Sequence, residues 1–117
     1  MSKRSIRLYV DDIQESISRI EAYTTTLTFE AFQEDKKTID AVVRNLEIIG
    51  EAARNIPESI QSKHPDIPWH EIIGMRNKII HEYFGIEKET LWKTIQDDLP
   101  QFKKRIEALV QLQQRAE

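Results

Sequence analysis

The chain has 117 residues, of which 39% are hydrophobic and 32% charged, so it fits a single domain with apolar helix stripes and charged outer faces. It contains no cysteine, which excludes disulfides, thiolate metal sites and a cysteine nucleophile. The net charge of −3 means that nucleic acid must be held by a local basic patch. No segment approaches the ~20 apolar residues of a membrane span and no secretory h-region forms, so we expect a cytoplasmic protein.

The first predicted helix covers about residues 4–26, because apolar residues recur there at alternating intervals of four and three positions. Its stripe consists of Ile6, Val10, Ile13, Ile17 and Ile20. The run "TTTLT" at 24–28 follows this stripe. Its β-branched residues lose side-chain freedom in a helix, so we expect the chain to turn or loosen there.

A second helical stripe ends at Pro57, a residue that cannot continue a helix. Gly50 lies on this stripe, where it weakens the helix but lets a neighbouring backbone come close. A short helical turn is expected around residues 58–63, in a connector that contains two further prolines. The apolar positions of the stripe are Ile39, Val43, Leu46, Ala53 and Ile56.

The third helix is predicted to start at or just after Pro68 and to run to about Tyr83, before Gly85 breaks it. A fourth begins near residue 87 and should be kinked by Pro100. The sequence therefore predicts one all-α domain over residues 1–117, an antiparallel bundle of four to five helices with a kinked C-terminal helix. The apolar positions of the fourth helix are Leu91, Ile95, Leu99, Phe102, Ile106, Leu109, Val110 and Leu112.

The third helix places a guanidinium in the middle of an apolar face. At ~100° per residue, one side of this helix holds Trp69, Ile72, Ile73, Arg76, Ile80 and Tyr83. A buried arginine stays charged and therefore needs a negative partner. That partner is either a structural carboxylate, Glu47 or Glu51, or a phosphate that arrives with a ligand.

Asn77 and His81 are four residues apart, so the amide can hydrogen-bond and orient the imidazole. His81 lies ~140° from Arg76 on an ideal helix, and one helix alone would not aim both side chains at one atom. They would converge if the last turn distorts, or if two copies of the helix meet across a two-fold axis, which is the geometry we prefer. A cation for phosphate, an orienting amide and a proton-exchanging imidazole together suit phosphodiester chemistry.

The segment "GMRNKIIHEYFGI" resembles the R-x4-H signature of HEPN domains, in the R-x4-H-x-Y form of HepT-like toxins. The similarity extends to "RNLEIIGEAARNIP", to "HPDIPW" before the motif and to the following helix, and so covers most of the chain. The resemblance implies an all-α bundle that forms a homodimer and places two R-x4-H motifs in one cleft. It also implies a metal-independent endoribonuclease without a cofactor, whose partner is a minimal nucleotidyltransferase antitoxin of the MntA type.

Applied to this sequence, the resemblance implies that Arg76 binds the scissile phosphate and that Asn77 orients the site. His81 would be the general acid/base for attack by the ribose 2′-hydroxyl. This assignment fits RNA chemistry, because RNA supplies its own nucleophile and the protein needs only proton transfer and a cation.

Tyr83 matches the tyrosine that the nucleotidyltransferase modifies with AMP, and the added bulk and charge beside His81 would silence the site. Glu51 matches the family's G-E-A segment and would support the site by pairing with Arg76 or Arg54. Lys78 would be solvated or touch the RNA backbone.

The resulting hypothesis is the toxin of a type VII-like toxin–antitoxin system, cutting tRNA or mRNA. One alternative is a non-catalytic helical subunit that binds substrate or nucleotide for a nucleotidyltransferase, which the net acidity of the chain favours. The other alternative is a dimeric bundle with a purely structural role.

Overall fold

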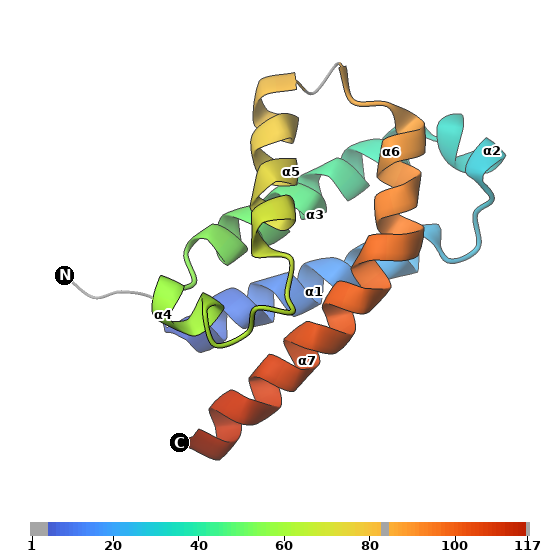
Figure 1. Cartoon of the computed structure of the whole chain (residues 1–117). Helices are drawn as coiled ribbons and strands as arrows, with labels where there is room; N and C mark the ends of the chain where they lie inside the picture. The colour runs from blue at the N-terminus through green and yellow to red at the C-terminus, as the bar shows by residue number, and fades with distance from the viewer. Residues whose placement is uncertain (1–4, 83–84, 117) are drawn as a thin grey trace.

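The computed structural model describes residues 5–82 and 85–116, and the regular structure in these two ranges is helical (Figure 1). The predicted all-α fold is confirmed: four long helical rods are joined by two short helices, α2 and α4. The elements are α1 (Ile6–Thr24), α2 (Phe29–Gln33), α3 (Lys36–Arg54), α4 (Glu58–Gln61), α5 (Trp69–Glu82), α6 (Lys88–Lys93), the π-helical segment η2 (Thr94–Asp98) and α7 (Leu99–Ala116).

The loosening predicted after the first stripe is confirmed, because α1 ends at Thr24. The hydroxyl of Thr24 donates to the carbonyl of Ile20 at 2.7 Å, so this buried hydroxyl has a partner. The sequence did not predict α2, which starts after Thr28. The hydroxyl of Thr28 accepts from the amide of Ala31 at 3.1 Å, as an N-cap residue does.

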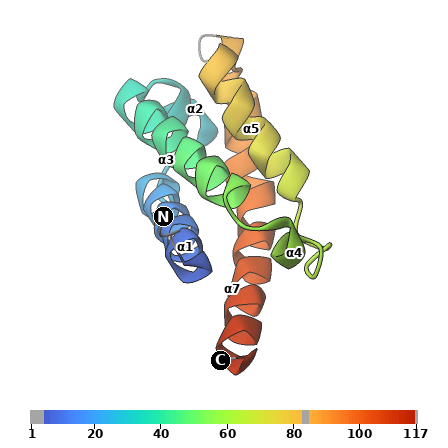
Figure 2. The same ribbon diagram turned by 90° about the vertical axis from the view of Figure 1, so that its left-hand side faces the viewer.

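The central element is α3, which lies between α1 and α5 in Figure 2 and packs against both. Asp35 caps it by accepting from the amide of Thr38 at 3.0 Å and from its hydroxyl at 2.7 Å. The helix ends at Arg54, three residues before Pro57, which confirms the predicted stop. In Figure 1, α1 and α3 run antiparallel, and so do α5 and α6.

The core is formed by residues of the predicted apolar stripes together with residues outside them, such as Phe32 and Val42. Ile13, Ile20, Phe32, Val42, Ala53, Ile106 and Leu109 are completely shielded from solvent. Phe32 reaches α6 through its ring, whose centroid lies 5.1 Å from that of Trp92. α7 is fastened to α1 by the Lys103 Nζ–Glu21 Oε1 ion pair at 3.0 Å. The short helix α2 is thus part of the core rather than a surface turn.

The C-terminal rod changes direction ahead of Pro100, as predicted: α6 and α7 point along different lines in Figure 1. Between them, η2 forms one turn of π-helix, in which the amide of Leu99 donates to the carbonyl of Thr94, five residues earlier. Pro100 has no amide hydrogen to continue the α-helical ladder, which is a sufficient cause for the irregular turn. Within residues 5–82 and 85–116, no helix combines the length and apolarity needed to cross a bilayer.

Candidate functional site

The position of the site depends on Gly50, the residue of α3 at which α5 crosses it. A methyl group at this position would clash with Cβ of Arg76 and would lie 2.9 Å from its Cγ and 3.2 Å from the carbonyl oxygen of Ile72. Only a residue without a side chain allows such a close approach. The glycine therefore determines where the Arg76 side chain leaves α5.

Arg76 finds its negative partner on α3. Its Nη2 lies 2.9 Å from Oε2 of Glu51, and its side chain is 21% exposed. Of the two carboxylates considered, Glu51 is the partner, whereas Glu47 lies 3.9 Å from Arg44. Among the described residues, Nε of Arg76 and Oε2 of Glu51 are buried without a well-aligned hydrogen bond. The guanidinium is therefore neutralised by an ion pair but still has donor capacity to offer.

Asn77 holds the other side of the guanidinium, because its Oδ1 accepts from Nη1 of Arg76 at 2.8 Å. This bond replaces the expected one between Asn77 and His81 within the described part of the chain. The amide thus orients the cation rather than the imidazole.

Glu51 is shared among three neighbours. Its Oε1 accepts from Arg54 at 3.3 Å and from Asn55 at 3.4 Å, while Oε2 faces Arg76. Partial burial raises the pKa of this carboxyl, but the Arg54 hydrogen bond and the charges of Arg54 and Arg76 outweigh it and lower the pKa overall. Glu51 is therefore ionised, and it pairs with both arginines that the sequence offered.

Arg76 forms part of the wall of a hollow of about 300 Å³ between α1 and α3. The other polar walls come from α1, with Tyr9 and Asp12, and from α3 and its C-cap, with Arg44, Glu47, Glu51 and Asn55. Sequence reasoning missed Tyr9, Asp12, Arg44 and Asn55, because the walls come from helices far apart in the chain. Of these four residues, only Asn55 could have been predicted, because it lies four residues after Glu51 and the two side chains therefore meet on one helix face.

His81 and Lys78 are exposed on α5 and are not among the residues that line this hollow. The structure brings Arg76, Asn77 and Glu51 together and leaves the imidazole on another side of the helix, as the ~140° separation predicted. Tyr83 lies outside the described residues.

One expectation about α5 needs correction. Ile80 was placed on the core-facing side with Arg76, but it is 44% exposed, and Ile79 is the buried residue at 3%. The two positions lie ~100° apart around the helix axis, and the observed packing turns Ile79 rather than Ile80 toward the core. An apolar residue close to Asn77 and His81 therefore faces solvent.

The site offers a cation and an amide, which suit anion binding, whereas the imidazole of His81, a group able to transfer protons, lies on another side of α5. Across residues 5–82 and 85–116, no three histidine, aspartate or glutamate side chains are grouped so that they could hold a metal ion.

Comparisons with known proteins find similar sequences over most of the chain. The family model described as "Ribonuclease HepT-like" matches residues 13–109. A protein of Thermococcus cleftensis named "Probable ribonuclease HepT" is 50% identical over 92% of this chain and 97% of its own length. "Putative RNase MJ0127" of Methanocaldococcus jannaschii is 41% identical over 94% of this chain and 91% of its own length. No solved structure gives a significant match.

Proposed function

The chain belongs to the HepT-like ribonuclease family, and from this premise we propose that it cleaves RNA with Arg76, Asn77 and His81 as its catalytic residues. The observation that carries the proposal is the environment of Arg76. Its side chain is held by Asn77 at the edge of a hollow and retains an unsatisfied donor, as expected for a group that awaits an anion.

Arg76 would bind the scissile phosphate. Two phosphate oxygens can accept from Nη2 and Nε together, which gives a stronger and more directional contact than the single carboxylate oxygen near Nη2 now. Glu51 would turn toward Arg54, with which it already shares a bond. Its role is then to hold the guanidinium in position until RNA arrives.

His81 would transfer the protons. As a base it takes the proton of the ribose 2′-hydroxyl while that oxygen attacks phosphorus; the bond from phosphorus to the 5′-oxygen breaks, and the departing oxygen receives a proton. The products are a 2′,3′-cyclic phosphate and a 5′-hydroxyl. Arg76 stabilises the charge that develops on the phosphate, so the step needs no metal ion.

The active form would be a homodimer. A single chain keeps His81 out of the Arg76 hollow, so pairing two α5 helices across a two-fold axis is the simplest way to bring one protomer's arginine near its partner's histidine. The exposed Ile80 supports this face as the contact, because it lies beside Asn77 and His81 on α5.

The biological setting that we propose is a toxin–antitoxin pair with an MntA-type nucleotidyltransferase, and tRNA or mRNA as the substrate. AMP added to Tyr83 would place a negative phosphate two residues from His81 and repel RNA. Lys78, which is exposed near the site, would contact the RNA backbone and contribute to affinity without sequence preference.

The test is cleavage of total RNA and of tRNA in EDTA by purified protein, after intact-mass analysis for AMP. Arg76→Ala and His81→Ala should each reduce the rate at least ~100-fold. His70→Ala is the matched control, because His70 is exposed on the same helix but lies outside the motif.

Undiminished cleavage by both variants would refute the assignment of the residues. If the unmodified, folded wild type forms a dimer but cuts no RNA, the alternative function as a non-catalytic subunit of a nucleotidyltransferase complex takes its place.

A further inference from the structure

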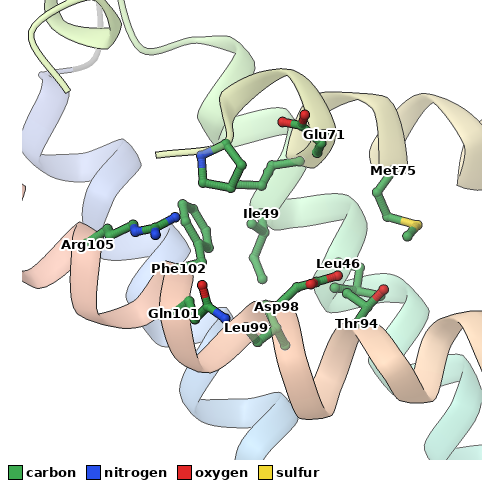
Figure 3. Close-up of a pocket in the computed structure, with 12 residues that line it drawn as sticks. Leu46, Ile49, Glu71, Met75, Thr94, Asp98, Leu99, Gln101, Phe102 and Arg105 are labelled. Atoms are coloured by element: carbon green, nitrogen blue, oxygen red, sulfur yellow. The ribbon is translucent and has the colours of Figure 1, made fainter. Parts of the chain in front are cut away.

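A second hollow, of about 230 Å³, lies between α5 on one side and η2 with α7 on the other (Figure 3). It shares no lining residue with the hollow beside Arg76. α5 packs mainly on α3, whereas α7, which continues directly from η2, packs on α1. The floor of the hollow is therefore formed by α3, through Leu46 and Ile49.

Most of this hollow is apolar. Ile72 and Met75 line it from α5, and Leu99 and Phe102 from α7. Ile72 and Met75 are only half-buried, although both pack against the core, so they leave apolar surface toward the hollow. A methionine in such a wall adapts easily to the shape of a bound group.

Two carboxylates stand at the edge of this apolar space. Glu71 comes from α5 and Asp98 from the π-helical segment, so they belong to facing walls in Figure 3. Neither has an ion pair or a side-chain hydrogen bond within the described part of the chain. The one cation in the lining, Arg105, already lies near a carboxylate, with its Nε 4.0 Å from Oδ2 of Asp66. The lining therefore holds two exposed carboxylates against one arginine and has a net negative charge.

We propose that this hollow binds a small organic cation, an ammonium or guanidinium group on an aromatic or branched aliphatic body. The body would lie on Ile49, Met75 and Phe102, and the cation would lie at the edge of the hollow, where Glu71 and Asp98 supply negative charge. The volume is below the ~300–1,000 Å³ of pockets for drug-sized ligands, so the body is no larger than about one aromatic ring. Phosphates suit the lining less well, because Glu71 and Asp98 outnumber its one cation, Arg105, and would repel them.

Three probes of the same shape test this proposal: 2-phenylethylammonium, neutral 2-phenylethanol and the phenylacetate anion. Each is titrated into the full chain while backbone amide NMR signals are followed. The ammonium should give saturable shifts at Met75, Thr94 and Leu99, the alcohol weaker ones and the anion none. Equal responses to all three probes, or no saturable shift with the ammonium, would overturn the proposal.

Charge-removing variants locate the site. Asp98→Asn and Glu71→Gln should each raise the dissociation constant of the ammonium about two- to fivefold, the size expected for a partly exposed ion pair. Asp97→Asn is the matched control, because Asp97 is the exposed neighbour of Asp98 but does not line the hollow. An equal loss of affinity in Asp97→Asn would show only a general charge effect and would refute the site. RNA cleavage plays no part in this measurement, so its outcome is independent of the proposed nuclease.

Discussion

Gly50 is the residue that lets α3 and α5 come close enough to place Arg76. Its missing side chain is replaced in space by Cβ and Cγ of the arginine. The sequence showed that Gly50 lies on an apolar helix stripe, where glycine weakens the helix. It did not show which residue fills the space beside the glycine, because that residue belongs to another helix.

Gly50→Ala should lower the free energy of unfolding by about 1–2 kcal/mol, because the overpacking cost of ~1–3 kcal/mol exceeds the gain in helix propensity of up to ~1 kcal/mol. Gly74→Ala is the control, since nothing lies within 4 Å of a methyl group there, and it should be neutral or stabilising. Urea unfolding of both variants measures the difference. Equal stability of the two would show that the close approach at Gly50 has no energetic consequence.

For Arg76, the sequence predicted the kind of partner but not its identity. The sequence predicted that Arg76 needs an anionic partner, because its charge lies on an apolar helix face. It did not identify the partner, because Glu47 and Glu51 lie one turn apart on α3 and either could face the arginine. Only the packing of α5 on α3 decides between them.

The lowered pKa of Glu51 gives a pH dependence with a definite sign. Because the folded-state pKa is below the ordinary value of 4.5, the carboxylate stabilises the fold at pH values above 4.5, and this contribution is lost as the pH falls through the folded-state pKa. The effect should be small, because the Glu51 side chain is 44% exposed. Glu51→Gln should therefore lose less stability than wild type between pH 6 and about pH 3. Identical pH profiles of unfolding would contradict the ion pair.

At the scale of helices, the stripes and prolines predicted the four long rods and the bend before Pro100. The short helix α2 was not predicted, because the β-branched run before it is typical of a loop and its five residues are too few to show a helical period. The π-helical form of η2 was not predicted either. Pro100 predicts that the backbone hydrogen bonds of the helix are interrupted, but not how the chain rearranges them.

The start of α3 depends on Asp35, whose side chain binds both the amide and the hydroxyl of Thr38. These bonds lower the pKa of Asp35 below its ordinary value of 3.8, so the cap stabilises the fold above that pH and weakens as the pH falls further. Asp35→Ala should lower the thermal midpoint at neutral pH, whereas Asp35→Asn should keep most of it, because asparagine also caps helices well. A thermal scan in which both variants melt together, below wild type, would show that the charge matters rather than the cap.

At the scale of the whole molecule, the separation of Arg76 and His81 makes the proposed site depend on assembly. The angle between them was readable from the sequence, but a single chain cannot show the surface that would complete the site. Ile80 is the candidate anchor, since it is 44% exposed on the same helix.

Ile80→Glu should convert the proposed dimer into a monomer, because a charge at the centre of an apolar contact has no partner. Leu112→Glu is the control: Leu112 is 51% exposed on α7, away from the motif. Sedimentation analysis gives both masses. A dimer that survives Ile80→Glu unchanged would move the interface to another face of the molecule.

The most direct test of a composite ribonuclease site is complementation between two inactive variants. Arg76→Ala and His81→Ala proteins are mixed, their subunits are exchanged, and RNA cleavage is measured in EDTA. If each site takes its arginine from one protomer and its histidine from the other, a mixed dimer contains one intact site, and we expect the mixture to regain a substantial part of the wild-type rate. A mixture that exchanges subunits but stays as inactive as either variant alone would contradict the shared site.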